Sequence, residues 1–160
     1  MYFHNIKEKI LIVDFGSQVT KLIARRVRDL GVYSEIITPE DLKKYENFNL
    51  TKGIILSGGP STVTKVKYQT IPKKIFKKEI PILGICYGLQ LIAKLFGGKI
   101  KSSKKRREFG RAIIYKKKKS LLTQNFFKPE TTVWMSHEDA VVKLPNSFQA
   151  IASTKNSRLT

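Results

Sequence analysis

Cysteine, histidine and acidic residues are scarce in this chain of 160 residues. Because Cys86 is the single cysteine, no disulfide can form within the chain, and a cytoplasmic location is expected. No apolar run approaches the roughly 18 residues that a membrane span requires, so no membrane association is expected. The first seven residues also lack the long apolar segment of a signal peptide. The hydrophobic content of 41% is ordinary for one globular domain with a sizeable core.

Acidic residues number only 12 against 31 lysines and arginines, which gives a net charge of +19. The excess is uneven, at +1 over residues 1–50 and +18 over residues 51–160. It lies in short runs that consist mostly of lysine, at positions 73–74, 77–78, 104–107 and 116–119. The runs lack interleaved aromatic residues on which bases would stack, and no RNA-binding motif accompanies them. We therefore expect a solvated basic face, with weak salt-sensitive binding to nucleic acids and no specific recognition of them.

The single cysteine stands at the centre of Gly84-Ile85-Cys86-Tyr87-Gly88, directly after the apolar run at 80–83. This pattern predicts a strand-to-helix turn like the nucleophile elbow, which lifts a reactive side chain above the end of a sheet. Glycine on each side allows the backbone to turn tightly. The alternative is a small buried thiol that only fills the core. The paired glycines favour a nucleophile, and we expect the nearby helix N-terminus to lower the pKa of its thiol.

Strand and helix patterns alternate over the first hundred residues. Short apolar runs predict strands at 10–13, 32–37, 53–57 and 82–83. Periodic apolar positions predict helices at 19–30, 71–79 and 89–96. We expect Ser17 to cap the first helix, Gly31 to end it in the left-handed conformation, and Gly97-Gly98 to close the last one. Such alternation indicates a parallel α/β sheet covered on both faces.

After Gly98 the pattern changes to strands without helices, predicted at 109–115, 132–135 and 148–152. We therefore predict one domain over residues 1–160, an α/β three-layer sandwich with a mostly parallel central sheet and a small antiparallel addition. In such sheets, function gathers at the carboxyl ends of the strands. Three loops are expected there, at 14–18, at 58–60 and at the cysteine elbow.

These loops contain groups that suit attack by a thiolate on an amide carbonyl. The reaction needs backbone N–H groups to hold the developing oxyanion. The N–H of Tyr87, at the start of the helix after Cys86, is well placed for this. The Gly58-Gly59-Pro60 loop could bring a second donor, although by itself this segment favours an ordinary turn.

Several motifs resemble those of the class I (triad) glutamine amidotransferases. They are Leu-Ser-Gly-Gly-Pro at 56–60, Gly-Ile-Cys-Tyr-Gly-Leu-Gln at 84–90 and Val-Trp-Met-Ser-His at 133–137. Within that superfamily, further segments look like the glutaminase domains of the GMP synthase family, namely 14–18, 23–28, 30–33, 107–110 and 152–154. The resemblance runs from about Ile10 to Thr154 and implies a flavodoxin-like topology.

The resemblance implies that the domain hydrolyses glutamine to glutamate and ammonia. Cys86 would be the nucleophile, and Gly59 and Tyr87 would supply the oxyanion N–H groups. Gly58, Gln90, Ser136 and His137 match positions that hold the substrate glutamine. The alternatives are that Gln90 faces solvent and that Ser136-His137 is a polar pair in a turn. No metal or cofactor is implied for this domain; ATP and magnesium would serve a synthetase domain of the ATP-pyrophosphatase type, which would use the ammonia.

Two substitutions and one absence depart from the family pattern. Val19 stands where the family usually has an aromatic residue, and Glu138 where glycine is common. Family members complete the triad with a His-Pro-Glu segment, but the only histidines here are His4 and His137, and neither precedes Pro-Glu. We therefore expect the chain to be a fragment that is nearly inactive alone, with a synthetase domain downstream or on a separate chain, and a homodimer formed by the full-length protein.

Two other functions are consistent with the sequence. The chain could be a glutaminase that serves another acceptor, such as those of anthranilate, CTP or imidazole glycerol phosphate synthesis; the segments at 14–18 and 25–28 argue against this. It could also be a catalytically silent module that binds a partner or nucleic acid through its basic face.

Overall fold

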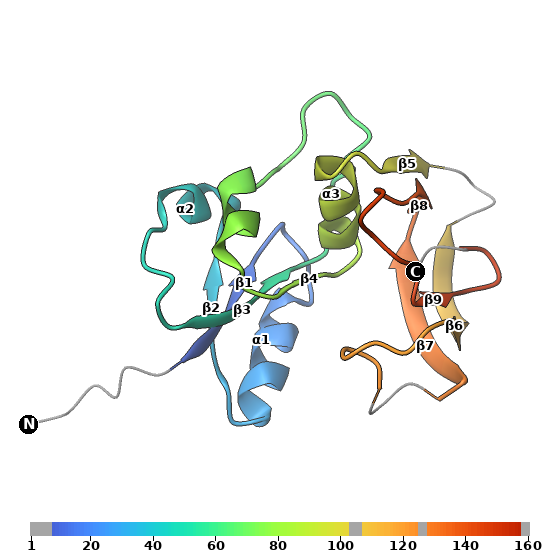
Figure 1. Cartoon of the computed structure of the whole chain (residues 1–160), viewed down its shortest axis with the longest axis horizontal. Coiled ribbons are helices and arrows are strands. Elements are labelled where there is room, and N and C mark those ends of the chain that lie inside the picture. Colours follow the sequence, from blue (N-terminus) through green and yellow to red (C-terminus); the bar gives the residue numbers. More distant parts are fainter. Residues whose placement is uncertain (1–7, 103–106, 125–127, 158–160) are drawn as a thin grey trace, which may run out of the picture. The chain divides into compact units, whose positions relative to one another are not determined.

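The computed structural model describes residues 8–102, 107–124 and 128–157 (Figure 1). The chain forms two compact units, one that ends at Leu91 and one that begins at Ile92. Two features named above lie outside the described residues, His4 and positions 104–106 of the basic run at 104–107.

A four-stranded parallel sheet forms the centre of the first unit. Its strand order is β2-β1-β3-β4, and every neighbouring pair is parallel. The strands are β1 (Lys9–Val13), β2 (Tyr33–Ile37), β3 (Thr51–Leu56) and β4 (Ile82–Gly84). The parallel sheet that the alternating pattern predicts is therefore confirmed.

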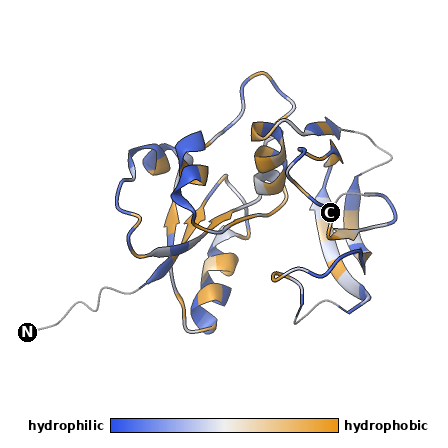
Figure 2. Cartoon of the chain, in the orientation of Figure 1, coloured by the Kyte–Doolittle hydropathy of each residue, from blue (hydrophilic) through white to orange (hydrophobic). Residues whose placement is uncertain are grey.

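Helices cover both faces of this sheet. They are α1 (Thr20–Asp29), α2 (Pro39–Lys44), the 3-10 helix η1 (Lys73–Lys78) and α3 (Tyr87–Leu95). Leu11, Ile12 and Val13 are all fully buried although successive side chains of a strand point to opposite faces. The helices explain this burial, because α1 lies on one face of the sheet and α2 and η1 lie on the other (Figure 1). The apolar strands between them stand out in Figure 2.

The ends of α1 agree in part with the sequence prediction. Gly31 is left-handed, at φ +80°, and its N–H bonds to the Arg28 carbonyl, which closes the helix as expected. At the other end, the predicted cap at Ser17 is wrong, because the helix begins at Thr20 and Val19 occupies the cap position. The Ser17 hydroxyl instead accepts the Val19 N–H two residues on, at 3.2 Å. The loop before α1 is thus organised as a turn.

Two other helical segments differ from the prediction. The segment expected as a helix at 71–79 forms the shorter 3-10 helix η1, on which Lys73, Lys74, Lys77 and Lys78 are exposed. This run of lysines is therefore a solvated face. Helix α2 was missed, although its sequence carries a start signal. The Thr38 hydroxyl accepts the Asp41 N–H at 3.1 Å, and Pro39 occupies the first helical position.

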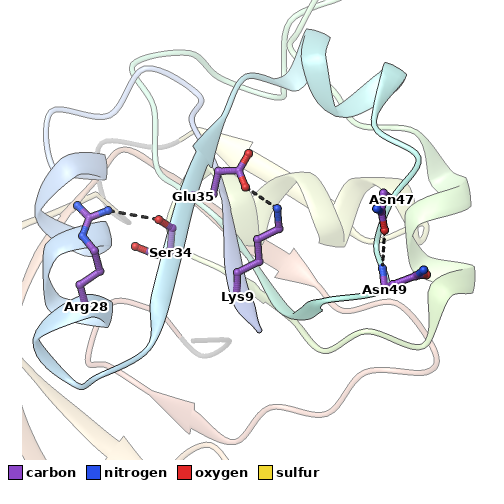
Figure 3. Close-up of polar contacts among 6 residues, drawn as sticks. All are labelled: Lys9, Arg28, Ser34, Glu35, Asn47 and Asn49. Atoms are coloured by element: carbon purple, nitrogen blue, oxygen red, sulfur yellow. Dashed lines mark hydrogen bonds and ion pairs between the residues drawn. The ribbon is translucent and has the colours of Figure 1, made fainter. Parts of the chain in front are cut away.

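Side-chain contacts hold the edge of the parallel sheet (Figure 3). Lys9 of β1 pairs with Glu35 of β2, and this hydrogen bond raises the pKa of the Lys9 ammonium. The Arg28 guanidinium donates to the Ser34 carbonyl at 3.3 Å, and the buried Ser34 hydroxyl donates to the Ala24 carbonyl at 2.9 Å. These two bonds join α1 to the edge strand β2. Before β3, the Asn49 N–H donates to the Asn47 side chain.

The second unit is built from antiparallel pairs. Strand β5 (Lys99–Ser102) pairs with β8 (Asp139–Lys143). A second sheet has the order β7-β6-β9, formed by β6 (Glu108–Lys116), β7 (Glu130–His137) and β9 (Ala152–Ser153). The antiparallel addition is confirmed, with β6 and β7 close to their predicted bounds. The strand predicted at 148–152 is wrong, since only Ala152–Ser153 pairs with β6.

Candidate active site

The Cys86 turn joins β4 to α3 in a conformation that is rare for a residue with a side chain. Cys86 has φ +48°, in the left-handed region. A Cβ at Gly84 would lie 2.6 Å from the Leu89 nitrogen, and one at Gly88 would lie 2.3 Å from the Leu56 carbonyl oxygen. Both distances are too short for any side chain. The structure therefore has the sharp strand-to-helix turn that the glycine spacing predicts.

The thiol of Cys86 is half-buried at this turn. Burial raises the pKa of the Cys86 thiol above its ordinary value, because desolvation penalises the thiolate. This is the opposite of the lowered pKa that the helix N-terminus led us to expect. The described part of the first unit contains no histidine that could accept the thiol proton. A nucleophile in such surroundings depends on a general base for activation.

Backbone hydrogen bonds connect the three loops at this edge of the sheet. The Ser57 N–H bonds to the Val13 carbonyl at 3.0 Å, so the ends of β1 and β3 are joined. The Ser57 carbonyl accepts the Gly88 N–H at 3.1 Å, which joins β3 to the cysteine turn. A Cβ at Gly58 would lie 3.6 Å from the Cβ of Cys86. The Gly58-Gly59 loop therefore lies directly beside the candidate nucleophile.

Two backbone N–H groups near Cys86 are available to a ligand. Tyr87 is the first residue of α3, so its N–H has no acceptor within the helix. In the part of the chain that the structure describes, neither the Tyr87 N–H nor the Gly59 N–H has a backbone acceptor. A Cβ at Gly59 would lie only 2.4 Å from the Phe15 carbonyl oxygen, so this loop packs tightly against the loop after β1.

The side chain of Tyr87 anchors the start of α3. It is buried, its ring lies 5.0 Å from that of Phe15, and its hydroxyl donates to the Gln69 carbonyl at 2.6 Å. Burial raises the pKa of Tyr87 to about 12. Gln90 is also buried, and its N–H bonds to the Cys86 carbonyl at 3.1 Å. The alternative that Gln90 faces solvent is therefore wrong.

Ser136 and His137 belong to the second unit, at the end of β7. They lie in a strand, so the alternative of a polar pair in a turn is wrong. Ser136 is exposed on the same face as Phe109, its partner on β6. The Nε2 atom of His137 lies 3.2 Å from Oε2 of the buried Glu108. The other oxygen of Glu108 accepts the Thr154 hydroxyl at 2.6 Å.

Glu108 and Ser57 were not identified from the sequence as site residues. Glu108 falls in the segment 107–110 that supports the family resemblance, but its contact with His137 depends on the pairing of β6 with β7.

Among the residues that the structure describes, no group of three metal-ligating side chains converges. Within the same residues, none of the helices has the length and apolar character needed to cross a membrane.

Comparisons with known proteins agree on one family. The model of the family described as glutamine amidotransferase class-I matches residues 11–159. A Treponema denticola protein named GMP synthase [glutamine-hydrolyzing] is 48% identical over 156 residues, which are 98% of this chain and 29% of that protein. The chain spans about three tenths of the length of the curated relatives it matches.

Solved structures show the same fold. A Thermoplasma acidophilum protein described as part of a GMP synthase has a TM-score of 0.82 at 30% identity, over 98% of this chain and 78% of that one. A glutamine amidotransferase from Thermotoga maritima has a TM-score of 0.74 at 21% identity, over 93% of this chain and 68% of that one. The second match bears on the fold alone.

Proposed function

The chain belongs to the class I glutamine amidotransferase family, and from this premise we propose that it is the glutaminase part of a glutamine-hydrolysing GMP synthase. One observation carries the proposal: Cys86 sits at φ +48° on a glycine-flanked turn, beside a loop and a helix start that each offer a backbone N–H. The names of the relatives favour a GMP synthase over a glutaminase that serves another acceptor, and over a catalytically silent module.

The proposed reaction begins with attack of the Cys86 sulfur on the side-chain amide carbon of glutamine. The carbonyl oxygen gains negative charge and accepts hydrogen bonds from the Gly59 and Tyr87 N–H groups. A base takes the thiol proton and delivers it to the leaving nitrogen, which departs as ammonia and leaves a thioester. Water then attacks the thioester, releases glutamate and restores the thiol. Gly58, Gln90, Ser136 and His137 would hold the substrate.

Among the described residues around Cys86, no histidine can act as the base in this scheme. Neither histidine of the sequence precedes Pro-Glu, and the side chain of His137 lies against Glu108. The resemblance assigns the base to a histidine in a His-Pro-Glu segment. A protonated thiol with a raised pKa is consistent with a site that acquires its base from that segment.

The acceptor of the ammonia is part of the same proposal. In an ATP-pyrophosphatase domain, xanthosine 5′-monophosphate would be adenylated with ATP and magnesium and then aminated to GMP, a step of purine biosynthesis. The relatives are about three times as long as this chain, which leaves room in them for such a domain. A homodimer of the full-length protein belongs to the proposal as well.

The test is the Cys86→Ala substitution in the full-length protein. Glutamine-dependent GMP formation should fall by at least about 10⁴-fold, because the covalent step is lost. GMP formation from added ammonia should stay within about twofold, because that route bypasses the thiol. Retained glutamine-dependent turnover in the variant would sink the assignment of Cys86.

A further inference from the structure

Ser57 is fully buried directly after β3, and its hydroxyl bridges two loops of the candidate active site. The oxygen accepts the Phe15 N–H at 3.0 Å and lies 2.8 Å from the Gly58 carbonyl oxygen. The Phe15 N–H is the donor in the first contact, so the hydroxyl keeps its own proton for the second. Ser57 therefore donates a hydrogen bond to the Gly58 carbonyl.

This bond restrains the orientation of the peptide between Gly58 and Gly59. The carbonyl of Gly58 and the N–H of Gly59 belong to one planar peptide unit, so holding one group aims the other. Glycine on both sides leaves the peptide free to adopt many orientations, because no Cβ restricts it. The Ser57 hydroxyl adds a hydrogen-bond restraint from a buried position.

We propose that Ser57 is a positioning residue for glutamine hydrolysis, which aims the Gly59 N–H at the oxyanion formed by attack of Cys86. The inference rests on the proposed function. Donors of this kind lower the barrier only when they are oriented before the reaction. The Ser57 carbonyl also accepts the Gly88 N–H, one residue after Tyr87, so one buried residue holds both proposed donors in place.

The experiment compares Ser57→Ala with the parental full-length protein. The kcat for glutamate release should fall by about 10²-fold or more, the effect of losing one oxyanion donor, while KM for glutamine stays within about threefold. Alkylation of Cys86 by iodoacetamide needs no oxyanion donor, so its rate should stay within about twofold. GMP formation from added ammonia should be unchanged.

Two further variants separate positioning from general loss of structure. Ser34→Ala also removes a buried hydroxyl, which donates to the Ala24 carbonyl at 2.9 Å. Ser34 lies away from the cysteine turn. This variant should keep kcat within about threefold. Ser57→Thr retains the hydroxyl and should keep kcat within about tenfold; it carries the test if Ser57→Ala does not fold.

Three results would overturn the inference. In the first, Ser57→Ala keeps kcat within threefold of the parental value. In the second, its Cys86 alkylation rate falls as far as its kcat. In the third, Ser57→Thr is as slow as Ser57→Ala. A different result, absence of Cys86-dependent glutamate release from the parental protein, would reject the proposed function itself.

Discussion

The cysteine turn of the first unit and the end of β7 in the second unit are built in different ways. Backbone groups hold the cysteine turn: glycines pack against carbonyls, and N–H groups of Ile85 and Gly88 bond to the end of β3. Side chains hold the end of β7, where Glu108 contacts His137 and Thr154. Both regions carry residues proposed to act on glutamine, yet only the first is specified by backbone geometry.

This difference predicts different responses to substitution. Gly59, Gly84 and Gly88 have no spare volume for a side chain, so one added methyl group at any of them displaces the main chain. A site held by side chains loses hydrogen bonds when one member is removed, while its strands stay paired. The following variants are ordered by the size of the effect that we expect.

Among the variants that leave Cys86 in place, the largest effect is expected from Gly59→Ala. Its Cβ would lie 2.4 Å from the Phe15 carbonyl oxygen, so the loop must move. Overpacking of this kind costs about 1–3 kcal/mol of stability. The Gly59 N–H would move with the loop, so glutamate release should fall by about 10²-fold or more. Thermal unfolding and steady-state kinetics of the full-length protein measure the two effects.

Gly58→Ala is the matched control for this prediction. Its Cβ would meet only ordinary contacts, the nearest at 3.6 Å from the Cβ of Cys86. Its melting temperature should therefore stay within a few degrees of the parental value. Equal destabilisation by both variants would show that the tight contact at Gly59 does not define the loop.

A smaller effect is expected from Glu108→Ala in the second unit. Removal of the buried carboxylate leaves the Thr154 hydroxyl without its acceptor and the His137 ring without the carboxylate that it contacts. An unpaired buried polar group costs about 1–3 kcal/mol. If the end of β7 holds glutamine, KM should rise more than kcat falls, because substrate binding and not the oxyanion is affected.

Glu130→Ala serves as the control, since Glu130 is exposed at the start of β7. It should change neither the melting temperature nor KM by a measurable amount. If Glu108→Ala and Glu130→Ala behave alike, the contact between Glu108 and His137 contributes nothing to the site.

The comparison also explains how far the sequence predicted the structure. The cysteine turn was predictable because its requirement is local: glycines two positions before and after Cys86 are visible in any reading of the chain. The parallel strands were predictable because a strand covered on both faces is a continuous apolar run, as in β1. Gly31 marked the end of α1 for the same kind of local reason.

The parts that the sequence did not predict depend on distant pairing. Strands β5 and β8 are short, and each is defined by its pairing with the other. Neither has a strong strand pattern in its sequence. Glu108 meets His137 only because β6 and β7 pair in one register. The Ser57 hydroxyl reaches Phe15, 42 positions away in the chain. The raised pKa of Cys86 also depends on burial, which the motif alone does not set.

The smallest effect is expected from Tyr87→Phe, which removes one side-chain hydrogen bond at the start of α3. Loss of the hydrogen bond to the Gln69 carbonyl should lower stability by about 1 kcal/mol at neutral pH. Cys86 alkylation should change little, because the buried ring that packs on Phe15 remains. Tyr33→Phe is the control, since Tyr33 is exposed.

A sharper measurement is the pH dependence of the stability difference between the parental protein and the Tyr87→Phe variant. Burial raises the pKa of Tyr87 from its ordinary value of 10 to about 12. At a pH between these two pKa values, the unfolded chain loses the phenol proton of Tyr87 while the folded chain keeps it. The parental protein therefore loses stability as the pH rises through this range. The phenylalanine ring of the Tyr87→Phe variant cannot titrate, so the gap in melting temperature between the two proteins should shrink from pH 9 to pH 12. A gap that stays constant over this range would show that the Tyr87 hydroxyl is not held in its buried, protonated state.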